Sequence, residues 1–117
     1  MSLLNSLYHI TATDEHEIHI RFDANHPVFA GHFPGAPVVP GACLVQIAEE
    51  LLAQQLQHPA QITGIHNLKF RQTVTPDMPV TFHITLQEDN KCAVLITHID
   101  TPNVQFTATY LCAHSNV

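Results

Sequence analysis

The stretch His32-Phe-Pro-Gly-Ala-Pro-Val-Val-Pro-Gly-Ala-Cys-Leu-Val-Gln46 is the most informative part of the chain. It holds three prolines and two glycines and leads into an apolar run that predicts a helix over residues 42–57. Each proline fixes its own φ and restricts the residue before it, so the loop has little conformational freedom. Gly41 has no Cβ, so a ligand can approach its backbone and the unpaired N–H groups of the following helix. A rigid loop that carries an imidazole and leads into a helix N-terminus suits chemistry on a carbonyl group.

Strand patterns surround the predicted helix. Residues 16–22 alternate polar and apolar side chains, which is the period of a half-buried strand. Residues 23–31 are predicted to form a connector with a short helical turn. Four further strands are predicted at 62–70, 80–86, 92–99 and 104–113, with turns at 88–91 and 100–103. The predicted helix is apolar on most sides, as expected of a helix wrapped by sheet, and the pattern indicates an α+β fold.

Composition limits the possible functions. The 117 residues suffice for one hydrophobic core, so a single domain is expected over residues 1–117. Only 12% of the residues are charged, which favours an oligomer because a lone small domain usually carries more surface charge. The formal net charge of −6 argues against nucleic acid as a partner.

The cysteines and the lengths of the apolar segments predict the cellular location of the protein. The three cysteines lie far apart in apolar stretches, so we expect buried free thiols in a reducing compartment rather than a disulfide. Residues 1–8 lack the pattern of a signal peptide, and no apolar segment is long enough to span a bilayer. We therefore expect a cytoplasmic protein with no membrane partner.

The loop and its continuation Ala42-Cys43-Leu44 resemble the signature of the beta-hydroxyacyl-acyl-carrier-protein dehydratases, which have the hotdog fold. The stretch 62–71, followed by Val74-Thr-Pro-Asp77, is similar to the strand and turn after the central helix of that family. The resemblance covers about residues 20–112. It implies one long central helix wrapped by an antiparallel sheet. It also implies a dehydratase that converts 3-hydroxyacyl thioesters on acyl carrier protein to 2-enoyl thioesters, in fatty-acid or polyketide- and polyene-like biosynthesis, without a cofactor.

The same resemblance implies a homodimer or higher homo-oligomer, in which each active site takes the loop histidine from one subunit and the helix carboxylate from the other. Dehydration removes a proton from C2 and expels hydroxide from C3. His32 is the expected base because imidazole titrates near neutral pH, and a structural histidine bonded to loop backbone is the alternative. Phe33 is expected to wall the acyl pocket, or else to be core. Gly41 and Ala42 are expected to bind substrate, with the Gly41 N–H directed at the thioester carbonyl; the alternative for Gly41 is a tight turn.

Gln46 departs from the family pattern, which ordinarily has Glu or Asp at this helix position and Gln four residues later, where this chain has Glu50. The two positions share a helix face but lie about 6 Å apart along the axis. Gln46 can bind the 3-hydroxyl or orient a water, but it cannot protonate a leaving hydroxide. Three outcomes stay open: Glu50 acts as the acid, His32 carries the proton both ways, or the site binds acyl groups without turnover. The alternative to a catalytic Glu50 is a purely structural pair, in which one of the adjacent carboxylates of Glu49 and Glu50 is solvated and the other is packed.

Lys69 and Arg71 flank Phe70 and are two of the four basic residues. The resemblance implies that they dock an acidic acyl carrier protein, and a charged outer strand face is the alternative. The histidines show no metal-ligand spacing and the cysteines no activating pattern, so neither a metal site nor a nucleophilic thiol is predicted.

Two other functions stay open. One is an acyl thioesterase on the same fold, in which a helix carboxylate such as Glu50 activates water. The other is a non-catalytic acyl-carrier-binding pseudoenzyme. The proline- and glycine-rich loop favours the dehydratase over the thioesterase, whereas Gln46 is the argument for the pseudoenzyme.

Overall fold

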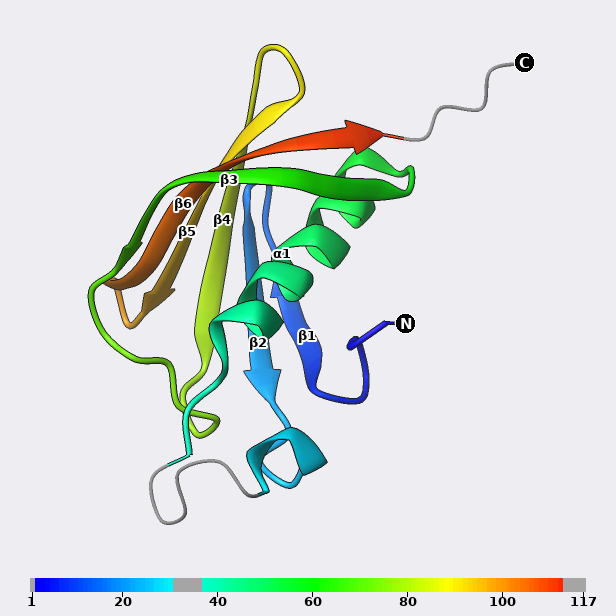
Figure 1. Ribbon diagram of the computed structural model, residues 1–117. Helices are drawn as coiled ribbons and strands as arrows, with labels where there is room; N and C mark the ends of the chain where they lie inside the picture. Colours follow the sequence, from blue (N-terminus) through cyan, green and yellow to red (C-terminus); the bar gives the residue numbers. More distant parts are fainter. Residues whose placement is uncertain (1, 31–36, 113–117) are drawn as a thin grey trace.

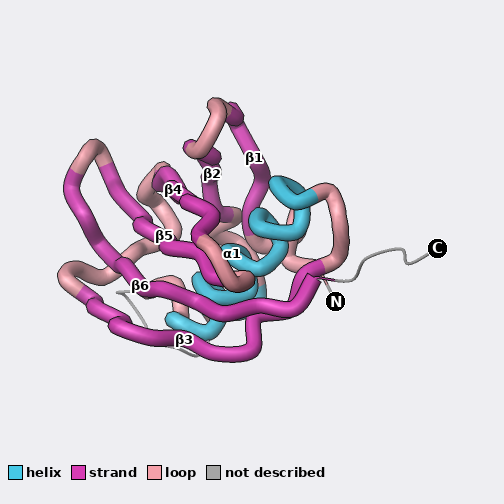
Figure 2. The backbone as a smooth tube through the Cα atoms, turned by 90° about the horizontal axis from the view of Figure 1, so that it is seen from above, coloured by secondary structure: helices cyan, strands magenta, loops and turns pink. Residues whose placement is uncertain are grey.

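The computed structural model describes residues 2–30 and 37–112 (Figure 1). The elements follow in the order β1 (Tyr8–Thr13), β2 (Glu17–Phe22), the 3-10 helix η1 (Pro27–Phe29), α1 (Gly41–Leu56), β3 (Ala60–Phe70), β4 (Val80–Gln87), β5 (Lys91–His98) and β6 (Thr101–Cys112). The strands form one sheet in the order β1-β2-β4-β5-β6-β3, and every pairing in it is antiparallel. The sheet curves around α1, which lies against its concave face (Figure 2). The predicted α+β arrangement is therefore confirmed.

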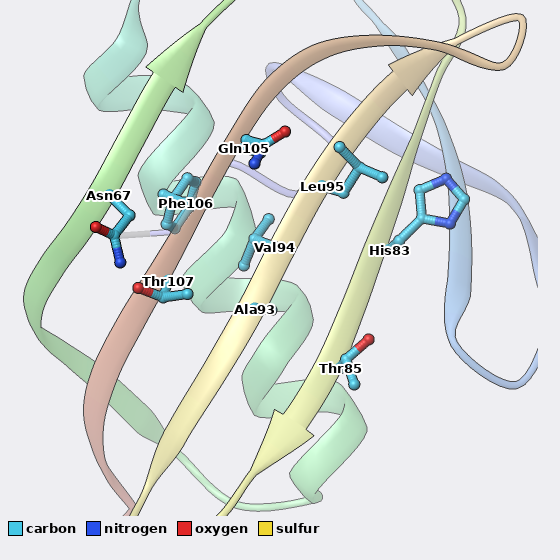
Figure 3. Close-up of a pocket in the computed structure, with 9 residues that line it drawn as sticks. All are labelled: Asn67, His83, Thr85, Ala93, Val94, Leu95, Gln105, Phe106 and Thr107. Atoms are coloured by element: carbon cyan, nitrogen blue, oxygen red, sulfur yellow. The ribbon is translucent and has the colours of Figure 1, made fainter.

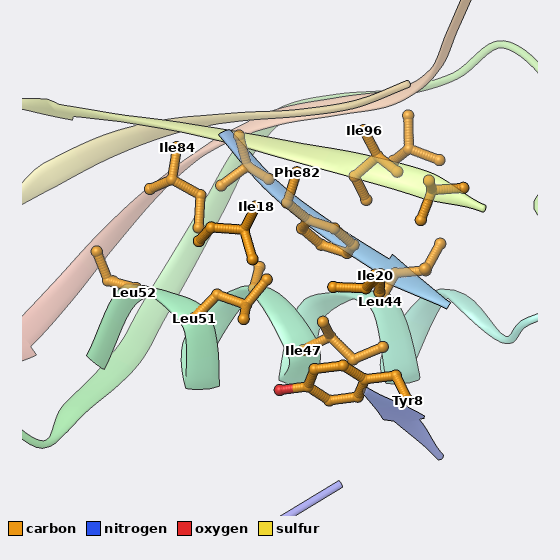
Figure 4. Packing of buried hydrophobic residues seen from close by; sticks show 14 of the residues in the cluster. Tyr8, Ile18, Ile20, Leu44, Ile47, Leu51, Leu52, Phe82, Ile84 and Ile96 are labelled. Carbon is orange, nitrogen blue, oxygen red and sulfur yellow. The ribbon is translucent and has the colours of Figure 1, made fainter. Parts of the chain in front are cut away.

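The core lies between α1 and the sheet. The buried face of α1 consists of Leu44, Ile47, Ala48, Leu51 and Leu52. These side chains face apolar side chains of the central strands, among them Ile18, Ile20, Phe82, Ile84 and Ile96 (Figure 4). Burial of each large apolar side chain contributes about 1.5–3 kcal/mol, so this contact holds the helix in the curve of the sheet. The helix ends at Leu56, and the C-cap Gln57 has a left-handed backbone (φ 61°) and an N–H that donates to carbonyls of the last helical turn.

Strand β1 was not predicted from the sequence. Only Tyr8 is buried in this strand, and residues 9–13 are half-buried or exposed, so no alternation marks it. A bulge between Ile10 and Ala12 further interrupts its pairing with β2. β1 is an edge strand whose position depends on β2 rather than on a pattern of its own.

The turn between β5 and β6 is also tighter than predicted. Ile99 and Asp100 form it with positive φ angles of 48° and 61°, and β6 begins at Thr101, so Pro102 lies inside the strand. The prediction placed Ile99 at the end of a strand. Because neither turn residue is a glycine, the sequence carries no strong signal for their left-handed backbone. The short helical turn predicted in the connector is confirmed as η1.

All three cysteines are free thiols. Cys92 is fully buried as predicted, and burial raises the pKa of its thiol, whereas Cys43 and Cys112 are half-buried. Among the residues that the structure describes, no helix has the length and apolarity needed to cross a membrane.

Candidate functional site

Two of the predicted site residues, His32 and Phe33, lie outside the described residues. The other six are placed by two elements. Four of them lie on α1, namely Gly41, Ala42, Gln46 and Glu50. Lys69 lies at the end of β3, and Arg71 follows directly after that strand. The candidate site therefore spans the first part of the helix and the nearby end of an edge strand.

The start of α1 is held by backbone contacts. Pro40 is the N-cap, and its carbonyl accepts hydrogen bonds from the N–H groups of Cys43 and Leu44 at 3.0 and 3.2 Å. The Phe70 ring lies so close to Gly41 that a Cβ built there would be 3.1 Å from Phe70 Cζ. The glycine thus lets the end of β3 approach the start of the helix without displacing the Phe70 ring. Gly41 is half-buried and Ala42 is exposed, so this end of α1 is accessible to a ligand.

Gln46 and Glu50 lie one helical turn apart and contact each other. Gln46 Nε2 donates a hydrogen bond to Glu50 Oε2 at 3.2 Å, and both side chains are half-buried. The structure thus brings together the two residues whose types are exchanged relative to the resembling family.

The Glu50 carboxylate also binds the N-terminal segment. The Leu3 N–H donates to Oε2 at 2.7 Å, and the Leu4 N–H donates to Oε1 at 3.1 Å. The Tyr8 hydroxyl on β1 donates to Oε1 at 2.9 Å, and the Ser2 hydroxyl donates to the same oxygen at 3.2 Å. With Gln46, this carboxylate accepts from three side chains and two backbone groups, which is the environment of an ionised acceptor.

These contacts shift two pKa values in opposite directions. Burial alone would raise the pKa of Glu50, but the hydrogen bonds from Leu3, Tyr8, Gln46 and Ser2 outweigh it and hold that pKa below its ordinary value. Burial and the adjacent Glu50 carboxylate raise the pKa of Tyr8 well above its usual range. At neutral pH the pair is therefore a neutral phenol that donates to a carboxylate.

Glu49 has a different partner. Its Oε2 accepts the Ile62 backbone N–H at 2.8 Å and so joins α1 to β3. Both neighbouring carboxylates are half-buried and bonded to backbone groups, rather than one solvated and one packed. Glu49 thus joins α1 to β3, whereas Glu50 accepts from Gln46 and from the N-terminal segment, so the two carboxylates have separate structural roles.

Lys69 and Arg71 are exposed on either side of Phe70. Arg71 Nε and Nη2 both donate to Gln105 Oε1 at 3.3 Å, which fixes the guanidinium over β6. The Phe70 ring between them touches the start of α1, so this end of β3 lies beside the start of the helix.

The sheet face away from α1 carries a second polar group that the sequence did not predict. Ligand atoms of Asp14, Glu17 and His19 lie within 4.8 Å of one another, and His83 Nδ1 lies 3.5 Å from Glu17 Oε1. A pocket of about 300 Å³ on the same face is lined by Asn67, His83, Thr85, Ala93, Val94, Leu95, Gln105, Phe106 and Thr107 (Figure 3). Of the predicted site residues that the structure describes, none lines this pocket.

Sequence reasoning missed the contacts of Ser2, Leu3, Leu4 and Tyr8 with Glu50. These residues lie more than forty positions away from Glu50 and follow no recognisable motif. Only a half-buried carboxylate on the helix, which requires partners, pointed to a contact of this kind.

Comparison with known proteins gives a family match and partial relatives. The sequence model of the ApeI-like family, described as ApeI dehydratase, matches residues 9–107. The 3-hydroxyacyl-[acyl-carrier-protein] dehydratase FabZ of Rhizobium rhizogenes is 35% identical over 72 residues, which cover 56% of this chain and 46% of that protein. The FabZ of Chlamydia trachomatis serovar D is 46% identical over 61 residues, which cover 44% of this chain and 40% of that protein. The chain thus spans less than half the length of these two relatives.

Solved structures share the fold at low sequence identity. An uncharacterized protein from Erwinia carotovora superposes with a TM-score of 0.72 at 18% identity, covering 90% of this chain and 92% of that one. The dehydratase heterocomplex ApeI:P from Xenorhabdus doucetiae gives 0.68 at 19% identity, covering 90% and 95%. A hypothetical thioesterase from Streptococcus pneumoniae with coenzyme A gives 0.60 at 13%, covering 91% and 85%. These neighbours confirm the expected hotdog fold. Because the family match extends over most of its length, the chain belongs to the ApeI-like dehydratase family.

Proposed function

We propose that the protein is a dehydratase that converts 3-hydroxyacyl thioesters on acyl carrier protein into 2-enoyl thioesters without a cofactor. The observation that carries the proposal is the dehydratase family match over residues 9–107. The partial similarity to FabZ proteins, whose name specifies 3-hydroxyacyl groups on acyl carrier protein, supports the substrate class.

In the proposed mechanism, His32 removes the proton from C2 of the substrate. The Gly41 N–H and the dipole of α1 stabilise the enolate-like oxygen of the thioester, and the accessible start of the helix supports this role. Ala42 lies beside the thioester at the same helix end, and Phe33 walls the acyl chain. The C3–O bond then breaks as the C2–C3 double bond forms, and the oxygen leaves as water after it receives a proton.

The proton on the leaving oxygen comes from His32, which we propose carries it from C2 to the hydroxyl. Glu50 is less suited to that step because its contacts favour the ionised form at neutral pH. Gln46 has no acidic proton and binds the hydroxyl instead. The absence of a separate acid is expected to slow turnover, since general acid catalysis typically contributes about 10²–10⁴-fold.

We further propose a homodimer formed along β3. This strand is at one end of the sheet and exposes Ile65, Leu68 and Phe70, with exposed fractions of 36, 44 and 58%. An edge strand with apolar side chains favours pairing with another chain, and a second copy would extend the sheet. The alternative is a second dehydratase subunit, as the heterocomplex from Xenorhabdus doucetiae illustrates.

The acyl carrier protein is proposed to dock at Lys69 and Arg71. Their place beside Phe70, which contacts Gly41, supports delivery of the thioester to the start of α1. The chain is acidic overall, so recognition of an acidic carrier depends on this local patch rather than on long-range attraction. We also propose a cytoplasmic location, because three free thiols persist best in a reducing compartment.

The test is incubation with a 3-hydroxyacyl thioester on acyl carrier protein, followed by mass spectrometry of the carrier. Loss of one water from the acyl group supports the dehydratase, and His32→Ala should abolish it. Release of free acid would indicate the thioesterase, and binding without conversion would indicate the pseudoenzyme.

A further inference from the structure

A cluster of metal-binding side chains lies on the face of the sheet away from α1. We propose that Asp14, Glu17 and His19 bind a divalent transition-metal ion such as Zn²⁺, which fastens the turn between β1 and β2 to the sheet. One ligand atom from each residue lies within 4.8 Å of those of the other two. The inference is independent of the proposed function, because this cluster contains none of the predicted site residues that the structure describes.

The backbone brings the three side chains together. Asp14 lies in the turn between β1 and β2, where its N–H donates to the Glu17 carbonyl at 2.8 Å and the Glu17 N–H donates back to the Asp14 carbonyl at 3.3 Å. Glu17 and His19 are two residues apart on β2, so their side chains point to the same face of the sheet. Ile18 between them is buried in the core. The hydrogen-bonded turn therefore holds Asp14 beside the other two residues.

His19 has one ring nitrogen held by the neighbouring strand. Its Nδ1 lies 2.9 Å from Thr81 Oγ1, and the two residues are paired directly across β2 and β4. When Nδ1–H donates to this hydroxyl, Nε2 carries the lone pair that a metal ion needs. Histidines that bind metals almost always have such a partner for the second nitrogen, which fixes the ring. Thr81 therefore acts as the positioning residue of the cluster.

The distances within the cluster are close to those around a bound ion. His19 Nε2 lies 3.6 Å from Asp14 Oδ2. Two ligand atoms that are each about 2.0–2.1 Å from a tetrahedral ion lie about 3.3–3.4 Å apart, so small side-chain movements suffice to bind one. The Glu17 carboxylate is faced from β4 by His83, whose Nδ1 lies 3.5 Å from Glu17 Oε1. Carboxylates that bind metals are commonly held by a second residue in this way.

The ligand types select the class of ion. Two carboxylates and one imidazole form a three-residue set that leaves a fourth position for water, as in many Zn²⁺ sites. Imidazole favours Zn²⁺ and neighbouring transition metals, whereas Mg²⁺ prefers oxygen ligands in an octahedral arrangement. The side chains of Asp14 and His19 are 71 and 37% exposed, so an ion can enter from solvent.

Calorimetry of the full chain without an affinity tag tests the site, with Zn²⁺ and Mg²⁺ titrated separately at neutral pH. We expect saturable binding of Zn²⁺ and much weaker binding of Mg²⁺. Asp14→Asn and His19→Gln remove ligands, and each should weaken Zn²⁺ binding by about 10–100-fold or more. Thr81→Val removes only the hydroxyl that holds His19, and should weaken binding by about tenfold.

Glu15→Gln is the matched control. It removes the same charge as Asp14→Asn from the same turn, but Glu15 lies outside the cluster. Its affinity for Zn²⁺ should equal that of wild type. This control is needed because the chain has 10 histidines and a net charge of −6, either of which attracts Zn²⁺ weakly.

A measurement on wild type covers the case in which a variant does not fold. Diethyl pyrocarbonate modifies accessible imidazole nitrogens, and fragment mass spectrometry locates the modified residues. Zn²⁺ should protect His19 from modification. His16 is exposed and lies outside the cluster, so it should stay reactive.

Four results would overturn the inference. The first is a wild type without saturable Zn²⁺ binding, and the second is Mg²⁺ binding as tight as that of Zn²⁺, which would mark only an acidic surface. The third is a loss of affinity in Glu15→Gln as large as in Asp14→Asn. The fourth is unchanged affinity in both ligand variants, or equal protection of His16 and His19, which would place the ion elsewhere. Wild-type affinity in Thr81→Val would overturn the positioning role of that hydroxyl.

Discussion

The Glu50 carboxylate accepts a hydrogen bond from the Gln46 amide one helical turn away, at 3.2 Å. The same carboxylate accepts the Leu3 and Leu4 N–H groups. Gln46 has an amide at the helix position where the resembling family has an acid. The Glu50 carboxylate, one turn later, already accepts several hydrogen bonds. This relationship limits the role that each residue can have in the proposed dehydration.

Gln46→Glu should restore an acid and lower the free energy of unfolding. The new carboxyl would lie beside ionised Glu50, and repulsion between like charges raises its pKa above the ordinary value of about 4.3. A carboxyl with a raised folded pKa destabilises the fold fully above that pKa, and the penalty disappears as the pH falls below about 4.3. We expect a loss of about 1 kcal/mol at neutral pH, the equivalent of a pKa shift of about one unit, measured by urea unfolding at several pH values.

The same substitution tests the chemistry. If a missing acid limits turnover, Gln46→Glu should raise the rate of dehydration by about tenfold or more. Gln46→Met, which has neither an acid nor a hydrogen-bonding amide, is the control and should not gain activity. A rate for Gln46→Glu no higher than that of wild type would show that proton delivery is not limiting.

Glu50 should make the stability of the wild-type chain depend on pH. Its folded pKa is lowered, so its contribution is present above the unfolded pKa of about 4.3 and is lost as the pH falls through the folded pKa. Glu50→Gln should cost about 1–2 kcal/mol at neutral pH and progressively less in acid. Urea unfolding of both proteins between pH 3 and 7 measures the difference. A gap that stays constant with pH would contradict the assignment of an ionised acceptor.

Gly41→Ala should disturb Phe70 more than it disturbs the fold. The added Cβ would lie 3.1 Å from Phe70 Cζ, but the ring is 58% exposed and has room to move. We expect a change in unfolding free energy within about 1 kcal/mol, since alanine favours the helix while the ring must shift. A double-mutant cycle with Phe70→Ala measures the coupling, and additive effects would mean that the two residues do not interact.

Leu68→Lys should weaken the proposed dimer along β3. A charge on the apolar edge strand opposes pairing with a second copy. We expect light scattering to show a dimer for wild type and a monomer for the variant at the same concentration. Ile99→Lys alters a side chain that is 78% exposed in the β5–β6 turn and should remain dimeric. A monomeric wild type would contradict the homodimer.

Much of the fold was predictable because the helix and the central strands bury one face. Residues 16–22 and 80–86 alternate clearly, and β2 and β4 lie at those positions. Tyr8–Thr13 was missed because exposed edge residues are not constrained by burial. At the site, the exchange of Gln46 and Glu50 was visible in the sequence. The partners of Glu50 were not visible, because backbone N–H donors from a distant turn are independent of residue type.

The most direct test compares the rate of dehydration of a 3-hydroxyacyl thioester on acyl carrier protein for wild type, His32→Ala and Glu50→Gln. We predict measurable turnover in wild type, a loss of about 10²-fold or more in His32→Ala, and a loss of about tenfold or less in Glu50→Gln. An equally large loss in both variants would contradict the account, because Glu50 would then be the acid, moved by one helical turn.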